Sequence, residues 1–198
     1  MILSVFSLIL QLLAGTMPVV VFFYKKAWRH FEILIYLMSS VLATCIIIYT
    51  RINELNNHWV HNTFIIISFA TIGIFYLKRK VVLLNYLVLI GSIVFVFILA
   101  IEQKGNSLLV NSFQFVNFIF IIWSLVYFVL LTNNKSSKFD SNFLQTLNFS
   151  ILFYNCSSFL LFNFLQELVK NEMWFIHNII ESVSKLIIAY SFWKLQKN

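Results

Sequence analysis

Charged residues are scarce in this sequence. Asp, Glu, Lys and Arg make up 11% of its 198 residues, hydrophobic residues make up 61%, and the mean hydropathy is +0.88. A soluble globule of this length would have to expose an apolar surface. Uninterrupted apolar runs of about 20 residues are instead typical of membrane-spanning helices, and they lack the alternation of barrel strands. We therefore expect an all-α, polytopic membrane protein.

Cysteine and catalytic motifs are scarce as well. Only Cys45 and Cys156 occur, and both lie inside apolar runs, so neither a disulfide framework nor a zinc site is indicated. The sequence contains no HExxH motif, no pair of intramembrane aspartates and no cysteine–histidine arrangement. We expect no enzymatic activity, no catalytic residue and no metal site.

Seven apolar runs are present, each close to the roughly 20 residues that cross about 30 Å of hydrocarbon. The first run lacks a basic amino-terminal region and a small-residue cleavage site, so we interpret it as a retained helix. The connections are short, which favours a single transmembrane helical domain over residues 1–198. The predicted seven-transmembrane-helix bundle has helices at about 2–23, 31–50, 60–77, 81–101, 112–132, 145–166 and 173–193.

Positive charges lie mainly in alternate connections. Ten Lys and Arg residues lie after the first, third and fifth runs and in the tail, against three in the other connections. Since Lys and Arg in short loops stay on the cytoplasmic side, we expect the N-terminus outside and the C-terminus cytoplasmic. The net charge of +7 is therefore topogenic and gives no sign of nucleic-acid binding. We expect integration into a lipid bilayer, in the bacterial cytoplasmic (inner) membrane.

The last run carries three ionisable residues near its middle, His177, Glu181 and Lys185. A charge at the bilayer centre costs roughly 2.5–3.5 kcal/mol, so their helix face is expected to turn toward other helices. Glu181 precedes Lys185 by four residues, the favourable order for an ion pair on a helix. At 100° per residue, one polar face collects Trp174, His177, Asn178, Glu181, Ser182, Ser184 and Lys185.

Two interpretations of this face remain open. Buried polar residues hold helices together, and intramembrane ionisable groups also bind ligands or move protons. Other runs supply facing polar groups, including a stripe of Ser4, Ser7, Gln11 and Gly15 in the first run and Tyr36, Ser39 and Ser40 in the second. The candidate ligand-binding or proton-relay residues are His177, Asn178, Glu181, Lys185, Asn155, Tyr154, Gln114 and Asn117.

Short internal matches hint at duplication. "YLMSS" (Tyr36–Ser40) parallels "YNCSS" (Tyr154–Ser158), and "HN" occurs at His61 and again at His177. Either these matches arise by chance, or helices one to three correspond to helices five to seven with the fourth as a linker. The second layout is similar to that of the sugar-transporter and PQ-loop family, although the Pro-Gln motifs of that family are absent.

The spacing "ESVSK" (Glu181–Lys185) resembles the carboxylate-x-x-x-lysine on the last helix of microbial rhodopsins. The resemblance implies retinal bound to Lys185 as a Schiff base, with Glu181 in its counter-ion. The third run has no Asp, Glu or Arg, where that family places its main counter-ion. No other cofactor is indicated.

Three functions follow from these patterns. We expect foremost a non-enzymatic sensor or accessory subunit that passes a change in its polar interior to a membrane or cytoplasmic signalling partner. The alternative is a small-solute or proton-coupled transporter, in which Glu181 titrates beside Lys185. A retinal-binding, rhodopsin-like protein is the third.

Overall fold

The computed structural model describes residues 2–79, 82–102, 109–133, 138–164 and 175–195. Within these ranges the regular elements are all helical, which confirms the all-α part of the expected fold class. The long helices are α1 (Ile2–Lys25), α2 (Phe31–Ile52), α3 (His58–Leu77), α4 (Val82–Glu102), α5 (Val110–Asn133), α6 (Lys138–Asn163) and α8 (Phe175–Trp193), and a 3-10 turn, η1 (Trp28–His30), precedes α2.

Helix ends follow the apolar runs closely, with one exception. The first five helices begin and end within two residues of their predicted positions. The sixth was expected from residue 145, but α6 begins at Lys138 because its first turns, "KFDSNFLQ", are polar and precede the apolar run. Hydropathy locates the apolar part of a helix, not its ends. Residues 165–166 and 173–174 of the predicted sixth and seventh spans lie outside the described ranges.

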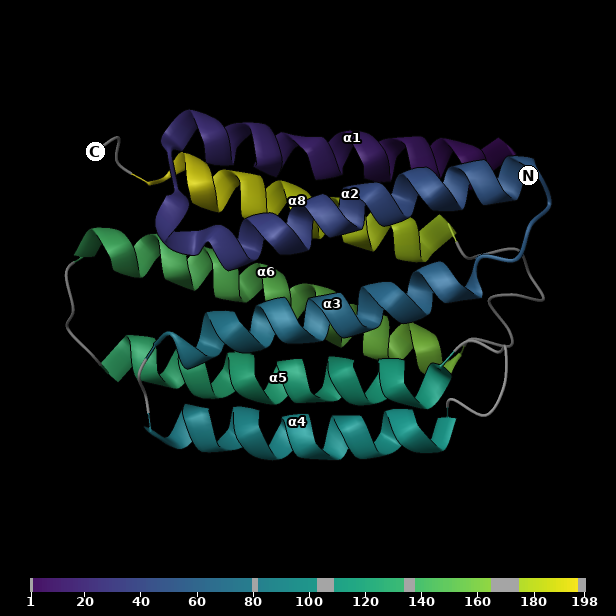
Figure 1. The fold of residues 1–198 in the computed structure, drawn as a ribbon. Coiled ribbons are helices and arrows are strands. Elements are labelled where there is room, and N and C mark those ends of the chain that lie inside the picture. The colour runs from purple at the N-terminus through teal and green to yellow at the C-terminus, as the bar shows by residue number, and fades with distance from the viewer. Residues whose placement is uncertain (1, 80–81, 103–108, 134–137, 165–174, 196–198) are drawn as a thin grey trace.

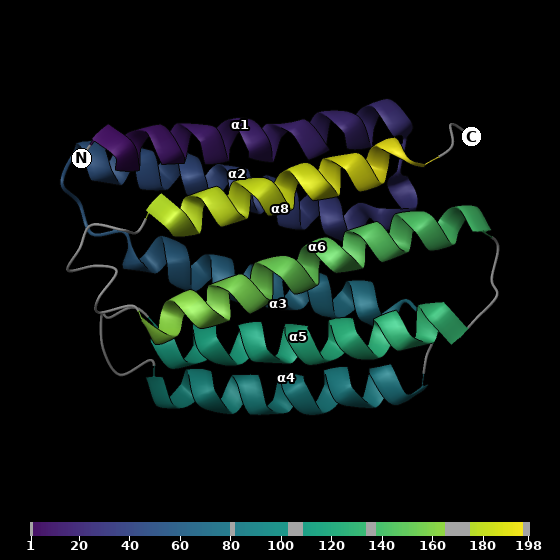
Figure 2. The ribbon, with the colours of Figure 1, turned by 180° about the vertical axis from the view of Figure 1, so that it is seen from behind.

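Successive helices run in alternate directions, so the two termini lie at opposite ends of the bundle (Figure 1). Six helices pack as a ring in the order α1, α2, α3, α5, α6 and α8, and α8 closes the ring against α1. Seen from behind, α8 lies between α1 and α6 (Figure 2). The remaining helix, α4, packs outside the ring against α3 and α5.

Helix α4 makes a close contact with the ring at Gly91. A Cβ atom at Gly91 would lie 3.0 Å from the ring of Trp123, which is fully buried in α5. A Cβ atom at Gly73 of α3 would lie 3.9 Å from the same ring, an ordinary contact distance. A side chain at Gly91 would therefore press on Trp123 at the contact of α4 with α5.

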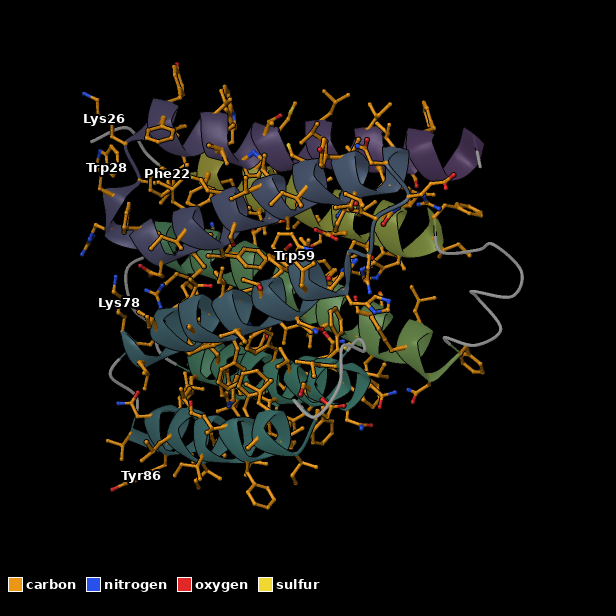
Figure 3. The ribbon with its side chains drawn as sticks, turned by 45° about the vertical axis from the view of Figure 1, so that its right-hand side comes forward. Phe22, Lys26, Trp28, Trp59, Lys78 and Tyr86 are labelled. Carbon is orange, nitrogen blue, oxygen red and sulfur yellow. The ribbon has the colours of Figure 1, made fainter. Side chains whose placement is uncertain are left out.

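The outer surface is apolar and aromatic. Five helices among the described residues, α1 to α5, are long and apolar enough to cross a membrane, whereas α6 and α8 are not among them. Trp28, Trp59 and Tyr86 are each more than half exposed, and side chains of this kind cover the outside of the bundle (Figure 3). Polar residues such as Asn148 and Ser184 are buried. This distribution suits contact with a lipid bilayer and is that of an integral membrane protein.

Candidate functional site

The polar face of α8 is turned into the bundle. Helix α8 buries its polar residues against α1 and α6, while its large exposed side chains are apolar. Trp174, which shares the predicted polar face, lies outside the described residues. The buried polar residues are His177, Asn178, Glu181, Ser182, Ser184, Lys185 and Ser191, and the exposed ones are Ile179, Val183, Leu186, Tyr190 and Trp193.

Glu181 is the centre of this face, and its carboxylate is bound by three helices. Lys185 Nζ lies 2.7 Å from Oε1, one helical turn away on α8. Gln11 of α1 donates its side-chain amide to Oε2 at 2.5 Å, and the Ser40 hydroxyl of α2 donates to Oε1 at 3.0 Å. His177 Nε2 lies 3.9 Å from Oε2. Every group that binds the carboxylate is itself buried, so the charge is compensated inside the protein.

The stripe on α1 matches the polar face of α8 residue by residue. Asn178 donates its amide to the Ser7 hydroxyl at 2.9 Å, one turn from the Gln11 contact. One turn further along α1, Gly15 faces Lys185, because a Cβ at Gly15 would lie 3.4 Å from Lys185 Nζ. Ser7, Gln11 and Gly15, which are four residues apart on α1, thus contact Asn178, Glu181 and Lys185 in turn. Glycine, the smallest residue, lies beside the long side chain of lysine.

A small cavity lies beside this cluster, between α2, α3, α5, α6 and α8. Its volume is about 30 Å³, which exceeds the roughly 10–15 Å³ that one water molecule needs. Asn117, Tyr154 and Asn155 of the predicted set line it, whereas Glu181 and Lys185 do not. The other lining residues are Tyr36, Phe64, Ile65, Ser68, Ile72, Phe113, Val116, Phe120, Ile151, Ser184 and Ile188.

The two asparagines of the cavity differ in how their amides are satisfied. Asn155 donates to the backbone carbonyl of Ile151 at 2.6 Å, one turn back on α6. The side-chain nitrogen of Asn117 is buried and has no hydrogen-bond partner among the described residues. A buried, unpaired amide donor carries a desolvation penalty that one polar partner would remove.

The predicted site residues therefore separate into three places. His177, Asn178, Glu181 and Lys185 form the cluster with α1 and α2, and Asn117, Tyr154 and Asn155 line the cavity. Gln114 belongs to neither, since its amide lies 3.5 Å from the side-chain oxygen of Asn163 near one end of α5 and α6.

Sequence reasoning did not single out a second buried polar network, centred on Tyr76 of α3. The Tyr76 hydroxyl donates to Asn148 of α6 at 2.8 Å and lies 2.7 Å from the hydroxyl of Ser124 on α5, while Asn148 donates to the Ser124 carbonyl at 2.9 Å. A tyrosine inside an apolar run, with Ser and Asn in neighbouring runs, was the available signal, because a buried tyrosine hydroxyl needs a partner.

The described residues contain no group of three or more His, Cys, Asp or Glu side chains suited to a metal ion. The cluster around Glu181 neutralises an acid with a base in the bundle interior, and it links α8 to α1 and α2. No known protein family, curated protein or solved structure matches the chain. Sequence pattern and geometry are thus the basis for a functional proposal.

Proposed function

We propose first that all seven helices cross the membrane, with the N-terminus outside and the C-terminus cytoplasmic. Helix α8 has 19 residues and is about 28 Å long at 1.5 Å per residue, close to the thickness of the hydrocarbon core. Its polar residues are buried and its exposed ones apolar, as a span with neighbours requires. Lys26 and Lys78 lie at one end of the bundle, as expected of a cytoplasmic face (Figure 3).

We propose further that the protein is a non-enzymatic sensor or accessory subunit. The observation that carries this proposal is the Glu181 carboxylate, which binds Gln11 of α1, Ser40 of α2 and Lys185 of α8 together. These internal partners occupy the carboxylate, which suits a tie between helices better than a substrate site. A change in the bundle that breaks the tie alters three helices at once, and their ends are available to a partner.

Cross-linking with a partner and transport in vesicles distinguish the two leading functions. We expect the full chain, cross-linked in its native membrane, to yield a defined partner adduct whose cross-linking sites shift in Glu181→Gln. Gln114→Leu is the matched control, because Gln114 lies outside the cluster, and its adduct should match the wild type. An unchanged adduct in Glu181→Gln, or no adduct at all, would contradict a sensor that works through this tie.

A transporter is the second candidate, and the cavity favours it. Five helices contribute polar and apolar groups to one space between them. A transporter predicts solute or proton uptake into proteoliposomes that disappears in Glu181→Gln. The retinal hypothesis makes a separate prediction, which is a pigment after addition of retinal that Lys185→Ala abolishes. The ion pair of Lys185 with Glu181 fits both a transporter and a retinal protein, but Lys185 does not line the cavity.

A further inference from the structure

The similarity between α2 and α6 extends well beyond the short match of tyrosine and serines. "FEILIYLMSSVLATC" (Phe31–Cys45) and "FSILFYNCSSFLLFN" (Phe149–Asn163) align without a gap and are identical at seven of fifteen positions. The identities include an aromatic residue at the start, the tyrosine and the paired serines. Both segments are entirely helical, and the two helices run in the same direction (Figure 1).

The next helix of each half aligns as well, in nearly the same register. "HNTFIIISFATIGIFYLK" (His61–Lys78) and "HNIIESVSKLIIAYSFWK" (His177–Lys194) share a histidine, an asparagine, a serine, an isoleucine and a lysine. Aligned residues are 118 positions apart for α2 with α6 and 116 positions apart for α3 with α8. The two alignments agree if the connection between the two helices is two residues shorter in the second half. Helices α1 and α5 show no comparable match.

The order of the helices in the ring is compatible with such a duplication. If α1, α2 and α3 correspond to α5, α6 and α8, the contacts of α1 with α2 and of α2 with α3 recur as α5 with α6 and α6 with α8. The contact of α3 with α5 would correspond to that of α8 with α1, although α8 packs far more extensively against α1 than α5 does against α3. Helix α4 stands outside the ring, as expected of a linker between two parallel repeats.

The cavity lies where the two halves meet, and corresponding residues line it from both sides. Tyr36 corresponds to Tyr154, Ser68 to Ser184, and Ile72 to Ile188, and all six are lining residues. Residues chosen only by proximity to a cavity would have no reason to form three corresponding pairs. The site is therefore a feature of the boundary between the halves.

The chemistry of the lining defines what binds there. The Asn117 amide needs a hydrogen-bond acceptor, no charged residue of the described ranges lines the space, and its volume of about 30 Å³ suits one or two water molecules. We propose that the cavity is a hydrated site on the boundary between two related three-helix halves, where ordered water accepts a hydrogen bond from Asn117. This inference rests on the fold alone and not on the proposed sensor function.

The sign of a stability change tests the site, with Asn117→Leu as the main variant. If water satisfies the amide, the nearly isosteric leucine removes a hydrogen bond and should lower the melting midpoint of the detergent-solubilised protein by about 2–4 °C. If the cavity is dry, the same change removes an unsatisfied donor and should leave the midpoint unchanged or raise it. Asn148→Leu is the matched control, because Asn148 is bonded to Tyr76 and Ser124 and its loss lowers the midpoint in either case.

A high-resolution experimental structure of the full chain provides the second measurement. We expect density for water within hydrogen-bond distance of the Asn117 nitrogen, between Ser68 and Ser184, and no such density in Asn117→Leu. An empty cavity in the wild type, or an Asn117→Leu midpoint at or above that of the wild type, overturns the proposal. Both results can be read whether or not a partner or a transported solute is ever found, so failure here is distinct from failure of the proposed function.

Discussion

Helices α4 and α8 reverse the usual relation between hydrophobicity and burial. Helix α4 is apolar almost throughout, yet only Leu84, Val88, Gly91 and Phe95 are buried. Helix α8 carries an acid, a base and a histidine, yet ten of its 19 residues are buried. In a soluble protein the more apolar helix would form the core. Here the more polar helix is the more buried one, as expected where a lipid bilayer accepts the apolar side chains of α4 and disfavours the charges of α8.

The comparison teaches that hydrophobicity alone does not predict which of these two helices is buried. Helix α8 closes the ring through the Glu181 cluster, whereas α4 is attached by packing of Gly91 against Trp123. Substitutions should therefore act through charge and hydrogen bonding at α8 and through shape at α4. Four predictions test this difference, in order of decreasing effect.

Separating the buried ion pair should have the largest effect. Lys185→Met leaves the Glu181 carboxylate without its cation in the bundle interior, and we expect a loss of about 3–5 kcal/mol in the free energy of unfolding. Unfolding in mixed micelles measures it.

The control for this prediction is the double variant Glu181→Gln/Lys185→Met. It removes both charges and keeps side chains of similar size, so it should recover most of the stability lost in the single variant. A double variant as unstable as Lys185→Met would show that packing, and not the uncompensated charge, dominates at this position.

A charge on the exposed face of α8 should have the next largest effect. Val183 is near the middle of the helix and 40% exposed. If this face contacts lipid, Val183→Asp should cost roughly 2.5–3.5 kcal/mol, as measured by membrane insertion of a reporter fusion.

Ile93→Asp on α4 is the matched variant, since Ile93 is 64% exposed on a helix that is apolar enough to span. Equal costs would establish α8 as a span of the same kind as α4. A change within about 0.5 kcal/mol at Val183, as on a water-exposed surface, would contradict the seventh span.

The fold could be predicted well from the sequence, for a physical reason. An uninterrupted run such as Val82–Glu102 leaves only a lipid-facing helix as a solution, so the positions of the first five helices followed from hydropathy. Helix α6 was harder, because its polar first turns add helix without adding apolar length. The ring order depends on which helices contact each other, and no single run contains that information.

The site was predictable in part. The spacing on α8 and the stripe of Ser4, Ser7, Gln11 and Gly15 each indicated an inward face, and the structure places Ser7, Gln11 and Gly15 of that stripe against α8. Their register, and the choice of Ser40 as a further partner, depend on packing across helices. The separation of Gln114 from the cavity is of the same kind, since it depends on the packing of α5 against α6.

The third largest effect is expected from a change of side-chain size at the contact of α4 with α5. Gly91→Ala places a Cβ 3.0 Å from the Trp123 ring, which is buried and held by neighbouring aromatic rings. We expect a loss of about 1–3 kcal/mol in the free energy of unfolding from overpacking. Gly73→Ala is the control, because the same ring lies 3.9 Å from its added Cβ and should tolerate it. Equal losses of stability for Gly91→Ala and Gly73→Ala would show that the effect comes from replacing glycine in a helix and not from the close contact of α4 with Trp123.

The smallest effect is expected on the outer face of α4. Leu89 is 57% exposed and faces away from the ring, so Leu89→Ala should change the free energy of unfolding by no more than about 0.5 kcal/mol. Leu84, fully buried on the same helix, is the matched residue, and Leu84→Ala should cost about 2–5 kcal/mol. Unfolding of both variants in mixed micelles provides the comparison. A loss at Leu89 as large as that at Leu84 would mean that a protein surface, rather than lipid, covers this face, because only tightly packed neighbours make the removal of a leucine side chain so unfavourable.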